Sequence, residues 1–347
     1  MRLTRSASRW TSGATTRPRA EGSAMRPTSR SPVPPGTVPR QDGRRTAATT
    51  GAAAAIGGRF AVRSLQVRSD PVSLAVVGAG PSALACLDQA ELVIREVERS
   101  CSQADPSSPL SVANATPDRW HTVPASLAVT VETAAAAHRR TGGLFDPRCR
   151  ADAGRLWSPR VVEDDGRWQM HLDGHAVDLG GVSQGIAVRR GAAELAGAGE
   201  GWMVDVGGDG CFAGAGPDGD GWQIGIDDAA GGMRPVLVLD TTDAACTTSA
   251  TRIRRWRADG RPAHQVVDPR VGCLRGDGLR SVTVLAADAA WSEAWSRALL
   301  HAGARGIRQR AEAHGVAAAW LGPEGAVETT RLLDPRVVWR RPVSRSA

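Results

Sequence analysis

A tight turn at residues 178–185, with the sequence DLGGVSQG, combines residue types that could hold a phosphate group. Asp178 precedes two glycines, and a helix is expected to begin near Ser183. Exposed backbone N–H groups at a helix N-terminus favour a bound anion such as phosphate. A plain strand–turn–helix junction would show the same pattern. Because Gly-Gly turns are common, the turn taken alone favours that structural interpretation.

Three later segments also carry side chains capable of chemistry. GGDG at 207–210 predicts a hairpin turn, which by itself needs no further role. His264 and Asp268 lie on either side of a short apolar run, and a single histidine is more often structural than catalytic. Glu293 and Arg297 are spaced i, i+4 and share a helix face, which usually gives a surface ion pair of little energetic value. Separately, none of these segments identifies a function.

A possible dinucleotide fingerprint, G-x-G-x-x-A, occurs in the stretch AVVGAGPSALA at residues 75–85. Gly78 and Gly80 would form the turn between a strand and a helix. The fingerprint also requires a second parallel strand that ends in an acidic residue about 20 residues on. Glu96 and Glu98 fall inside the following helix instead, and prolines come after it. We therefore expect a hairpin strand that turns into the first helix, and no dinucleotide site at this place.

Hydrophobic periodicity predicts the elements that would position these residues. Helices are expected over residues 82–101, 124–143 and 288–303, with Asp288 as the cap of the last, and a strand, turn and helix over 175–199. Strands are expected over 59–67, 72–78, 201–206, 221–226, 235–241, 281–287 and 316–322. Helices and strands alternate irregularly, in hairpins as well as crossovers. This favours an α+β fold with mixed or antiparallel sheets and packed helices over a doubly wound parallel sheet.

The positive charge of the chain is concentrated at its N-terminus. The net charge is +7, but residues 1–63 hold 12 arginines against Glu21 and Asp42, about +10. The remainder carries about −3, so its composition argues against nucleic-acid binding by the folded part. A structural α+β domain whose arginine-rich tail binds nucleic acid stays an alternative. An affinity that falls steeply with salt and is lost with the tail would support it.

The composition predicts one folded domain behind a basic tail. Residues 1–60 are rich in Arg, Ser, Thr, Pro and Gly, so we expect a disordered tail. Residues 61–340 are expected to form a single domain, for which 347 residues with 41% hydrophobic content suffice. The six cysteines lack metal-site spacing and are expected to be free thiols. No segment of the sequence predicts a membrane helix or a signal peptide, so we expect a cytoplasmic chain with no integral membrane segment.

The order and spacing of the segments carry more information than any one of them. The sequence shows, in order, TGGLFDP (141–147), DLGGVSQGIA (178–187), GGD (207–209), WQIGI (222–226), TSA (248–250), QVVDPRVG (265–272), SVTV (281–284) and SEAWSRA (292–298), with Gly303 shortly after. Together they resemble the FAD:protein FMN transferase family, often called ApbE-like. That family typically shows T-x-G-x-F-D-P, D-L-G-G-I-A-K-G-Y-A, G-G-D, W-r-i-G-I, T-S-G, H-I-I-D-P-r-T-G, S-V-T-V and A-D-A-x-A-T-A. The resemblance covers residues 62 to 335, roughly.

The resemblance implies a reaction and its components. Members of the family bind FAD as substrate together with a divalent cation, usually Mg²⁺. They move FMN from FAD to a Ser or Thr hydroxyl of an acceptor flavoprotein and release AMP. Such a site must position the diphosphate, neutralise developing negative charge and activate the hydroxyl. Family members often act outside the cytoplasmic membrane, so an extracytoplasmic location is an alternative to the cytoplasmic one.

Matching motif positions implies roles for ten residues, and His264, one place before its motif, is an eleventh candidate. The residues expected to contact the flavin nucleotide are Leu144, Phe145, Asp146, Asp178, Gln184 and Val266. The residues expected at the metal are Gly181, through its carbonyl, with Glu293, Ser296 and Arg297. His264 is expected to assist deprotonation of the acceptor hydroxyl. An oxygen-rich site of carboxylate, carbonyl and water suits Mg²⁺.

Several of these positions depart from the family pattern. Glu293 stands for the usual Asp, and Arg297 stands for the usual Thr ligand. An arginine cannot ligate a cation, so Arg297 would contact phosphate or occupy the metal site. Gln265 stands for the usual His, with His264 one place earlier. The alternative to an active transferase is therefore a degenerate member that binds FAD or FMN without transfer.

Overall fold

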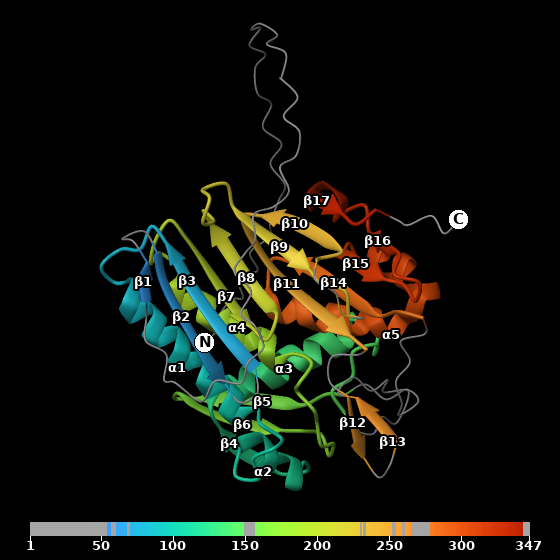
Figure 1. The fold of residues 1–347 in the computed structure, drawn as a ribbon. Helices are drawn as coiled ribbons and strands as arrows, with labels where there is room; N and C mark the ends of the chain where they lie inside the picture. Colours follow the sequence, from blue (N-terminus) through green and yellow to red (C-terminus); the bar gives the residue numbers. More distant parts are fainter. Residues whose placement is uncertain are drawn as a thin grey trace, which may run out of the picture. The chain divides into compact units, whose positions relative to one another are not determined.

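The structure, a computed structural model, describes residues 54–56, 60–67, 70–148, 157–229, 231, 234–251, 255–258, 261–264 and 278–342. Figure 1 shows antiparallel sheets packed with helices, which confirms the predicted α+β class. Most of the predicted tail at residues 1–60 lies outside the described residues. No helix in the described ranges is long and apolar enough to cross a membrane.

A nine-stranded sheet carries most of the fold, in the order β1-β2-β3-β7-β8-β11-β14-β15-β16. Its strands are β1 (Ala54–Ile56), β2 (Phe60–Val67), β3 (Asp70–Val77), β7 (Gly201–Val206), β8 (Asp209–Gly214), β11 (Asp243–Ala250), β14 (Ser281–Ala286), β15 (Ala317–Leu321) and β16 (Val327–Thr329). All of its pairings are antiparallel. Along β3, Val72, Leu74 and Val76 alternate with more exposed residues and are buried, as the two-residue period of a strand requires.

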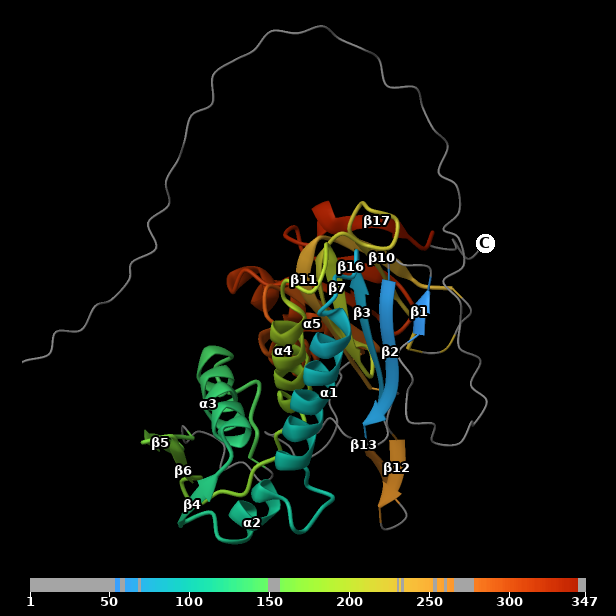
Figure 2. The same ribbon diagram turned by 90° about the vertical axis from the view of Figure 1, so that its left-hand side faces the viewer.

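Helices α1 (Ala83–Ser100), α4 (Ser183–Leu195) and α5 (Ala289–Ala313) pack against one face of this sheet. Figure 2 shows α1 and α4 side by side, with α1 next to β2 and β3. Leu87 and Ile94, seven residues apart in α1, point the same way and are fully buried. Asp288 caps α5 as predicted, because its side chain accepts the Trp291 N–H at 3.0 Å.

A second sheet packs on the nine-stranded sheet through its own apolar cluster. It consists of β9 (Trp222–Ile226), β10 (Leu237–Thr241) and β17 (Val337–Arg340) in the order β17-β10-β9, with the 3₁₀ turn η1 (Asp334–Arg336) before β17. Leu237 and Leu239 of β10 are fully buried in a cluster with Phe212 of β8 and Leu285 of β14. This cluster is separate from the core that the helices α1 and α4 form with the large sheet.

Smaller elements complete the described fold, together with the helix α3 (Ala125–Arg140), which contacts β6. They are α2 (Pro109–Ala115), the sheet β4 (Trp120–Val123), β5 (Arg160–Asp164) and β6 (Arg167–His171) in the order β4-β6-β5, and the hairpin β12 (Arg255–Ala258) with β13 (Arg261–His264). Trp157 anchors this region: it is fully buried, and its indole N–H donates to the Leu172 carbonyl at 3.0 Å.

The glycine motif at 75–85 forms the junction between β3 and α1, as the sequence predicts. Gly78 has a φ of 60°, a conformation that glycine adopts without steric cost. The Gly80 N–H donates to the Ala198 carbonyl at 3.1 Å. Helix α2 follows α1, and β3 pairs antiparallel with β2 and β7, so this part of the described chain contains no βαβ unit.

The prediction of a strand that leads into Asp178 is wrong. Val177 makes an isolated bridge with Arg148 and belongs to no strand. The reason is a side chain: Asn114 accepts the Val177 N–H at 2.9 Å and donates to the Val177 carbonyl at 2.8 Å. An amide side chain thus takes the two hydrogen bonds that a neighbouring strand would otherwise make.

Candidate active site

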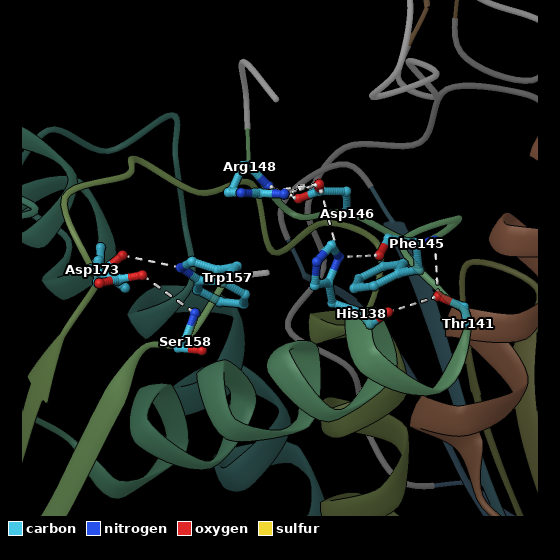
Figure 3. Close-up of polar contacts among 9 residues, drawn as sticks. His138, Thr141, Phe145, Asp146, Arg148, Trp157, Ser158 and Asp173 are labelled. Atoms are coloured by element: carbon cyan, nitrogen blue, oxygen red, sulfur yellow. Dashed lines mark hydrogen bonds and ion pairs between the residues drawn. The ribbon is translucent and has the colours of Figure 1, made fainter. Parts of the chain in front are cut away.

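The loop after α3 is fixed by two side chains near the end of that helix (Figure 3). Thr141 Oγ1 accepts the Phe145 N–H at 3.0 Å, and His138 Nδ1 lies 2.9 Å from the Phe145 carbonyl oxygen. Both glycines at 142–143 have positive φ, which closes the turn. Leu144 and Phe145, both predicted to contact the flavin nucleotide, are buried at 5% and 3% exposure.

Asp146 continues this loop and is paired with two buried groups. Arg148 Nε and Nη2 donate to its carboxylate at 2.9 and 2.6 Å, and His138 Nδ1 lies 3.8 Å from Oδ2 (Figure 3). A bidentate arginine–carboxylate pair of this kind fixes geometry strongly. The structure therefore gives Asp146 a part in holding the loop, in addition to the nucleotide contact that the sequence predicts.

The glycine turn begins where this loop meets Asp178. The Asp178 N–H donates to the Pro147 carbonyl at 2.6 Å, which joins the two segments. Oδ1 of Asp178 accepts the Gly180 N–H at 2.7 Å and tightens the turn. Two regions that the sequence analysis assigns to the flavin nucleotide are thus in direct contact, although they are 31 residues apart in numbering.

Helices α4 and α5 approach each other closely at Gly185. A Cβ on this glycine would lie 2.6 Å from the Ala289 carbonyl oxygen and from the Ala290 Cα, so glycine is required there. The approach brings Glu293 to the first turn of α4, where its Oε2 accepts the Gly185 N–H at 2.7 Å. A carboxylate at this place satisfies one of the free N–H groups of the helix and interacts favourably with its dipole. Glu293 is 2% exposed.

Arg297, one turn after Glu293 on α5, reaches over the glycine turn. Its Nη2 donates to the Gly180 carbonyl at 2.8 Å and lies 4.0 Å from Glu293 Oε1. A Cβ on Gly181 would lie 2.9 Å from the Arg297 Nε and 2.8 Å from the Phe145 ring. The absence of a side chain at Gly181 therefore leaves room for both the guanidinium and the aromatic ring next to the turn.

The turn between β7 and β8 and the strand β11 complete the surroundings. The Gln184 side chain donates to the Val206 carbonyl, just before the glycines at 207–208. Asp209 follows these glycines, and its Oδ1 accepts the Thr248 N–H of β11 at 3.2 Å. Gln184, which is predicted to face the nucleotide, is therefore also a link between α4 and this turn.

The carboxyl groups of the site lie in surroundings from which water is largely excluded. Burial raises the pKa of Glu293 to about 7, the Arg297 guanidinium and the Gly185 N–H oppose this rise, and the Asp178 charge adds to it. Burial also raises the pKa of Asp209 well above its usual value; the Glu293 charge adds to this effect, and Arg297 acts against it. The Arg297 guanidinium thus favours the charged form of Glu293, whose Oε1 lies 4.0 Å from its Nη2.

Residues 69–320 match the family model of the ApbE family. The chain belongs to the ApbE family. The curated FAD:protein FMN transferase of Treponema pallidum (strain Nichols) is 30% identical to it over 129 residues, 35% of this chain and 36% of that protein. The alignment therefore spans little more than a third of the length of this relative.

Solved structures of ApbE proteins share the fold. The ApbE protein of Thermotoga maritima MSB8 superposes with a TM-score of 0.67 at 22% identity, covering 79% of this chain and 97% of that chain. The flavinyl transferase ApbE of Pseudomonas stutzeri, in its apo form, gives 0.64 at 19% identity, with 80% and 97% covered. The flavin transferase ApbE of Vibrio cholerae gives 0.64 at 19% identity, with 80% and 99% covered. At these identities the similarity shows the fold.

The four residues at which the ApbE resemblance implies a metal offer few free ligands here. Arg297 carries a positive charge and has no lone pair to donate. Glu293 Oε2 is engaged by the Gly185 N–H. Ser296 is fully buried; its Oγ donates to the Glu293 carbonyl at 2.9 Å and lies 2.7 Å from the Ser249 Oγ. In the ranges that the structure describes, no group of three or more His, Cys, Asp or Glu side chains could hold a metal ion. These side chains fit the expected Mg²⁺ site poorly, and we derive no step through a metal.

The side chains of two predicted site residues are not described. Val266 lies outside the described residues, with the rest of the predicted motif at 265–272. His264 ends β13, and only its backbone is described. The roles of His264 and Val266 in this ApbE-family chain remain predictions.

Four residues that the structure brings to the site are given no role by the sequence prediction. They are Asp209, Thr248 through its backbone, and Gln103 and Asn114, whose amides both donate to the Val177 carbonyl. The GGD and TSA motifs of the ApbE resemblance contain Asp209 and Thr248, so a signal exists in the sequence. It does not reveal that β8 and β11 are neighbours.

Proposed function

We propose that this chain is a FAD:protein FMN transferase, which moves FMN from FAD to a serine or threonine hydroxyl of an acceptor flavoprotein. One observation carries the proposal: the loop at 144–147, the glycine turn at 178–185 and the first turns of α5 converge on one buried, charged site. Membership of the ApbE family and the printed name of the Treponema pallidum relative support the same activity.

The arrangement of positive and N–H groups suits the diphosphate of FAD. Arg297 and the N-terminus of α4 lie next to each other, because the guanidinium donates to Gly180 and the helix begins at Ser183. A planar guanidinium matches phosphate oxygens bidentately, and a helix N-terminus favours an anion. In the proposal, the diphosphate lies at this place and Phe145 lies beside it.

The proposed reaction exchanges one phosphorus–oxygen bond for another. The acceptor hydroxyl oxygen forms a bond with the phosphorus on the FMN side of the diphosphate. The bond from that phosphorus to the bridging oxygen breaks, and AMP leaves with the electron pair. The hydroxyl proton goes to a base, for which His264 is the candidate. Reactions of this type depend on positioning and on stabilisation of negative charge, which Arg297 would supply.

The poor fit of the side chains to Mg²⁺ favours a second candidate function. A family member that has lost its metal site could retain FAD binding without transfer. Both candidates share the nucleotide site, and they differ in whether the diphosphate bond is broken.

The decisive experiment incubates the purified chain with FAD and a library of serine- and threonine-containing peptides, with MgCl₂ in one arm and EDTA in the other. We expect intact-mass spectra to show covalent FMN on a peptide, together with an equal amount of AMP. FAD binding with neither AMP nor FMN-peptide in both arms would contradict the transferase and support the binding protein.

A further inference from the structure

Arg297 links the accessible side of the site to the buried carboxylate of Glu293. The Arg297 side chain is 16% exposed, whereas the Glu293 side chain, whose Oε1 lies 4.0 Å from Nη2, is 3% exposed. A carboxylate held away from water is unfavourable unless a positive group lies nearby. The Arg297 guanidinium provides this charge for Glu293.

The guanidinium also has an unused hydrogen-bond donor. Nη2 donates to Gly180, but the Nε–H of Arg297 is buried and makes no hydrogen bond within the described part of the chain. This Nε lies close to Gly181, 2.9 Å from the place that a Cβ of residue 181 would take. A buried donor without an acceptor is unfavourable, and an oxygen of a bound ligand would satisfy it.

We propose that Arg297 is the resident cation of this site: its guanidinium balances the charge of Glu293 and holds the diphosphate of FAD without a divalent metal ion. The inference rests on the proposed function for the identity of the ligand. It goes beyond that function because Arg297 supplies the positive charge that a metal ion would otherwise supply.

The geometry explains why a metal and this arginine exclude each other. The guanidinium donates to the carbonyl of Gly180 and covers Gly181, where the sequence resemblance implies a carbonyl ligand. A cation placed there would meet a positive charge at close range and would compete with the arginine N–H for the Gly180 carbonyl oxygen. Removing the guanidinium would free this oxygen and leave Glu293 without its charge partner.

The first test uses the unmodified chain and FAD alone. FAD affinity is measured by flavin fluorescence in EDTA and in MgCl₂, and the melting temperature without FAD is measured in both. We expect the affinity to differ by less than about threefold between the two conditions, and the melting temperature to be unchanged by Mg²⁺. FAD binding that requires Mg²⁺ would overturn the inference.

The second test replaces the arginine by the residue type that the family shows at this place. Arg297→Thr should weaken FAD binding in EDTA by about 10- to 100-fold, because charge-assisted hydrogen bonds are lost. Mg²⁺ should restore most of the affinity and raise the melting temperature of this variant, since the carboxylates are then free to attract it. Arg297→Lys, which keeps the charge and loses the planar fork, should bind FAD more weakly than the parent and stay independent of Mg²⁺.

Arg308→Thr serves as the matched control. Arg308 lies further along α5, after the kink at Gly303, and pairs with Glu312 and Glu328 on the exposed side. We expect this variant to bind FAD as the parent does in both conditions. Arg297→Thr with parental affinity in EDTA would overturn the inference.

The outcomes separate this inference from the proposed function. Metal-independent FAD binding without AMP release would support the arginine site and contradict the transferase. AMP release only in MgCl₂ would support the transferase and contradict the resident cation. Absence of FAD binding in both conditions would contradict both.

Discussion

Glu293 interacts with two groups from different parts of the chain, the Gly185 N–H and the Arg297 guanidinium. Glu293→Ala would remove the acceptor of one and the charge partner of the other inside a buried region. We expect it to lower the free energy of unfolding by about 3 kcal/mol or more. Glu293→Gln keeps an acceptor oxygen and resembles the protonated acid, which is already populated near neutral pH because burial raises the pKa to about 7.

We therefore expect Glu293→Gln to cost less than about 1 kcal/mol at pH 7. Urea unfolding of both variants and the parent measures the difference. Equal losses for the two variants would show that the hydrogen bond to Gly185 contributes nothing.

His264 is the candidate base, and its contribution can be separated from binding. His264→Ala should slow FMN transfer by about 10²- to 10⁴-fold, the usual range for a general base, and leave FAD affinity unchanged. Single-turnover transfer to a peptide and flavin fluorescence give the two values. Unchanged turnover would remove His264 from the mechanism.

At the scale of elements, the contact between α4 and α5 depends on one glycine. Gly185→Ala would place a Cβ 2.6 Å from backbone atoms of residues 289 and 290, which cannot move without shifting α5. We expect a loss of about 2–3 kcal/mol in stability from this overpacking, together with weaker FAD binding because Glu293 and Arg297 lie on the shifted helix.

Gly306→Ala, also on α5, is the control for helix propensity. The nearest atoms to a Cβ there are 3.8 Å away, at ordinary contact distance. Alanine is the better helix former, so this variant should gain about 0.5–1 kcal/mol. Similar effects of the two substitutions in thermal unfolding would argue against a close contact at Gly185.

Asp205, near the end of β7, makes the stability of the protein depend on pH. Burial raises the pKa of Asp205 to about 6, although the Gly208 N–H opposes the shift. Between about pH 4 and about pH 6 the folded chain therefore binds more protons at this group than the unfolded chain, and stability contributed by Asp205 is lost as pH rises. Asp205→Asn, which cannot ionise, should stabilise the protein above about pH 6 and have little effect near pH 4.

The expected gain is about 1–2 kcal/mol, less than the full linkage value because the Asp205 side chain is only half-buried. Melting temperatures of parent and variant across this pH range measure it. A difference that does not change with pH would contradict the assignment.

For the whole molecule, the sequence predicts those features that depend on neighbouring residues. The helices α1, α3 and α5 show apolar residues at helical spacing, and Asp288 is a recognisable cap, so their positions follow from local pattern. The strand before Asp178 was predicted on the same grounds and is wrong, because Asn114, more than 60 residues earlier, takes the hydrogen bonds of Val177.

The site itself depends on contacts between distant parts of the chain. The order of motifs identifies the family and most residues of the site. It does not show that Glu293 caps α4, that Phe145 and Arg297 both pack against Gly181, or that Asp209 adds a second carboxyl group with a raised pKa. These facts require the pairing of β8 with β11 and the crossing of α4 and α5, which no local pattern encodes.

FAD binding should therefore stabilise the entire folded unit. The proposed site joins α3, α4, α5 and the large sheet, and a ligand that binds only the folded state adds about 2.7 kcal/mol at 100 times its dissociation constant. Leu239→Ala tests whether this stabilisation extends beyond the site, because Leu239 is fully buried in the separate cluster between the two sheets. It should lower stability by about 2–5 kcal/mol and leave FAD affinity unchanged.

FAD should then raise the unfolding free energy of the parent and of Leu239→Ala by the same amount, in one transition followed by both circular dichroism and tryptophan fluorescence. Equal increments follow because both clusters share strands of the nine-stranded sheet and unfold together. Two separate transitions, of which FAD shifts only one, would instead show that the second sheet unfolds independently of the site.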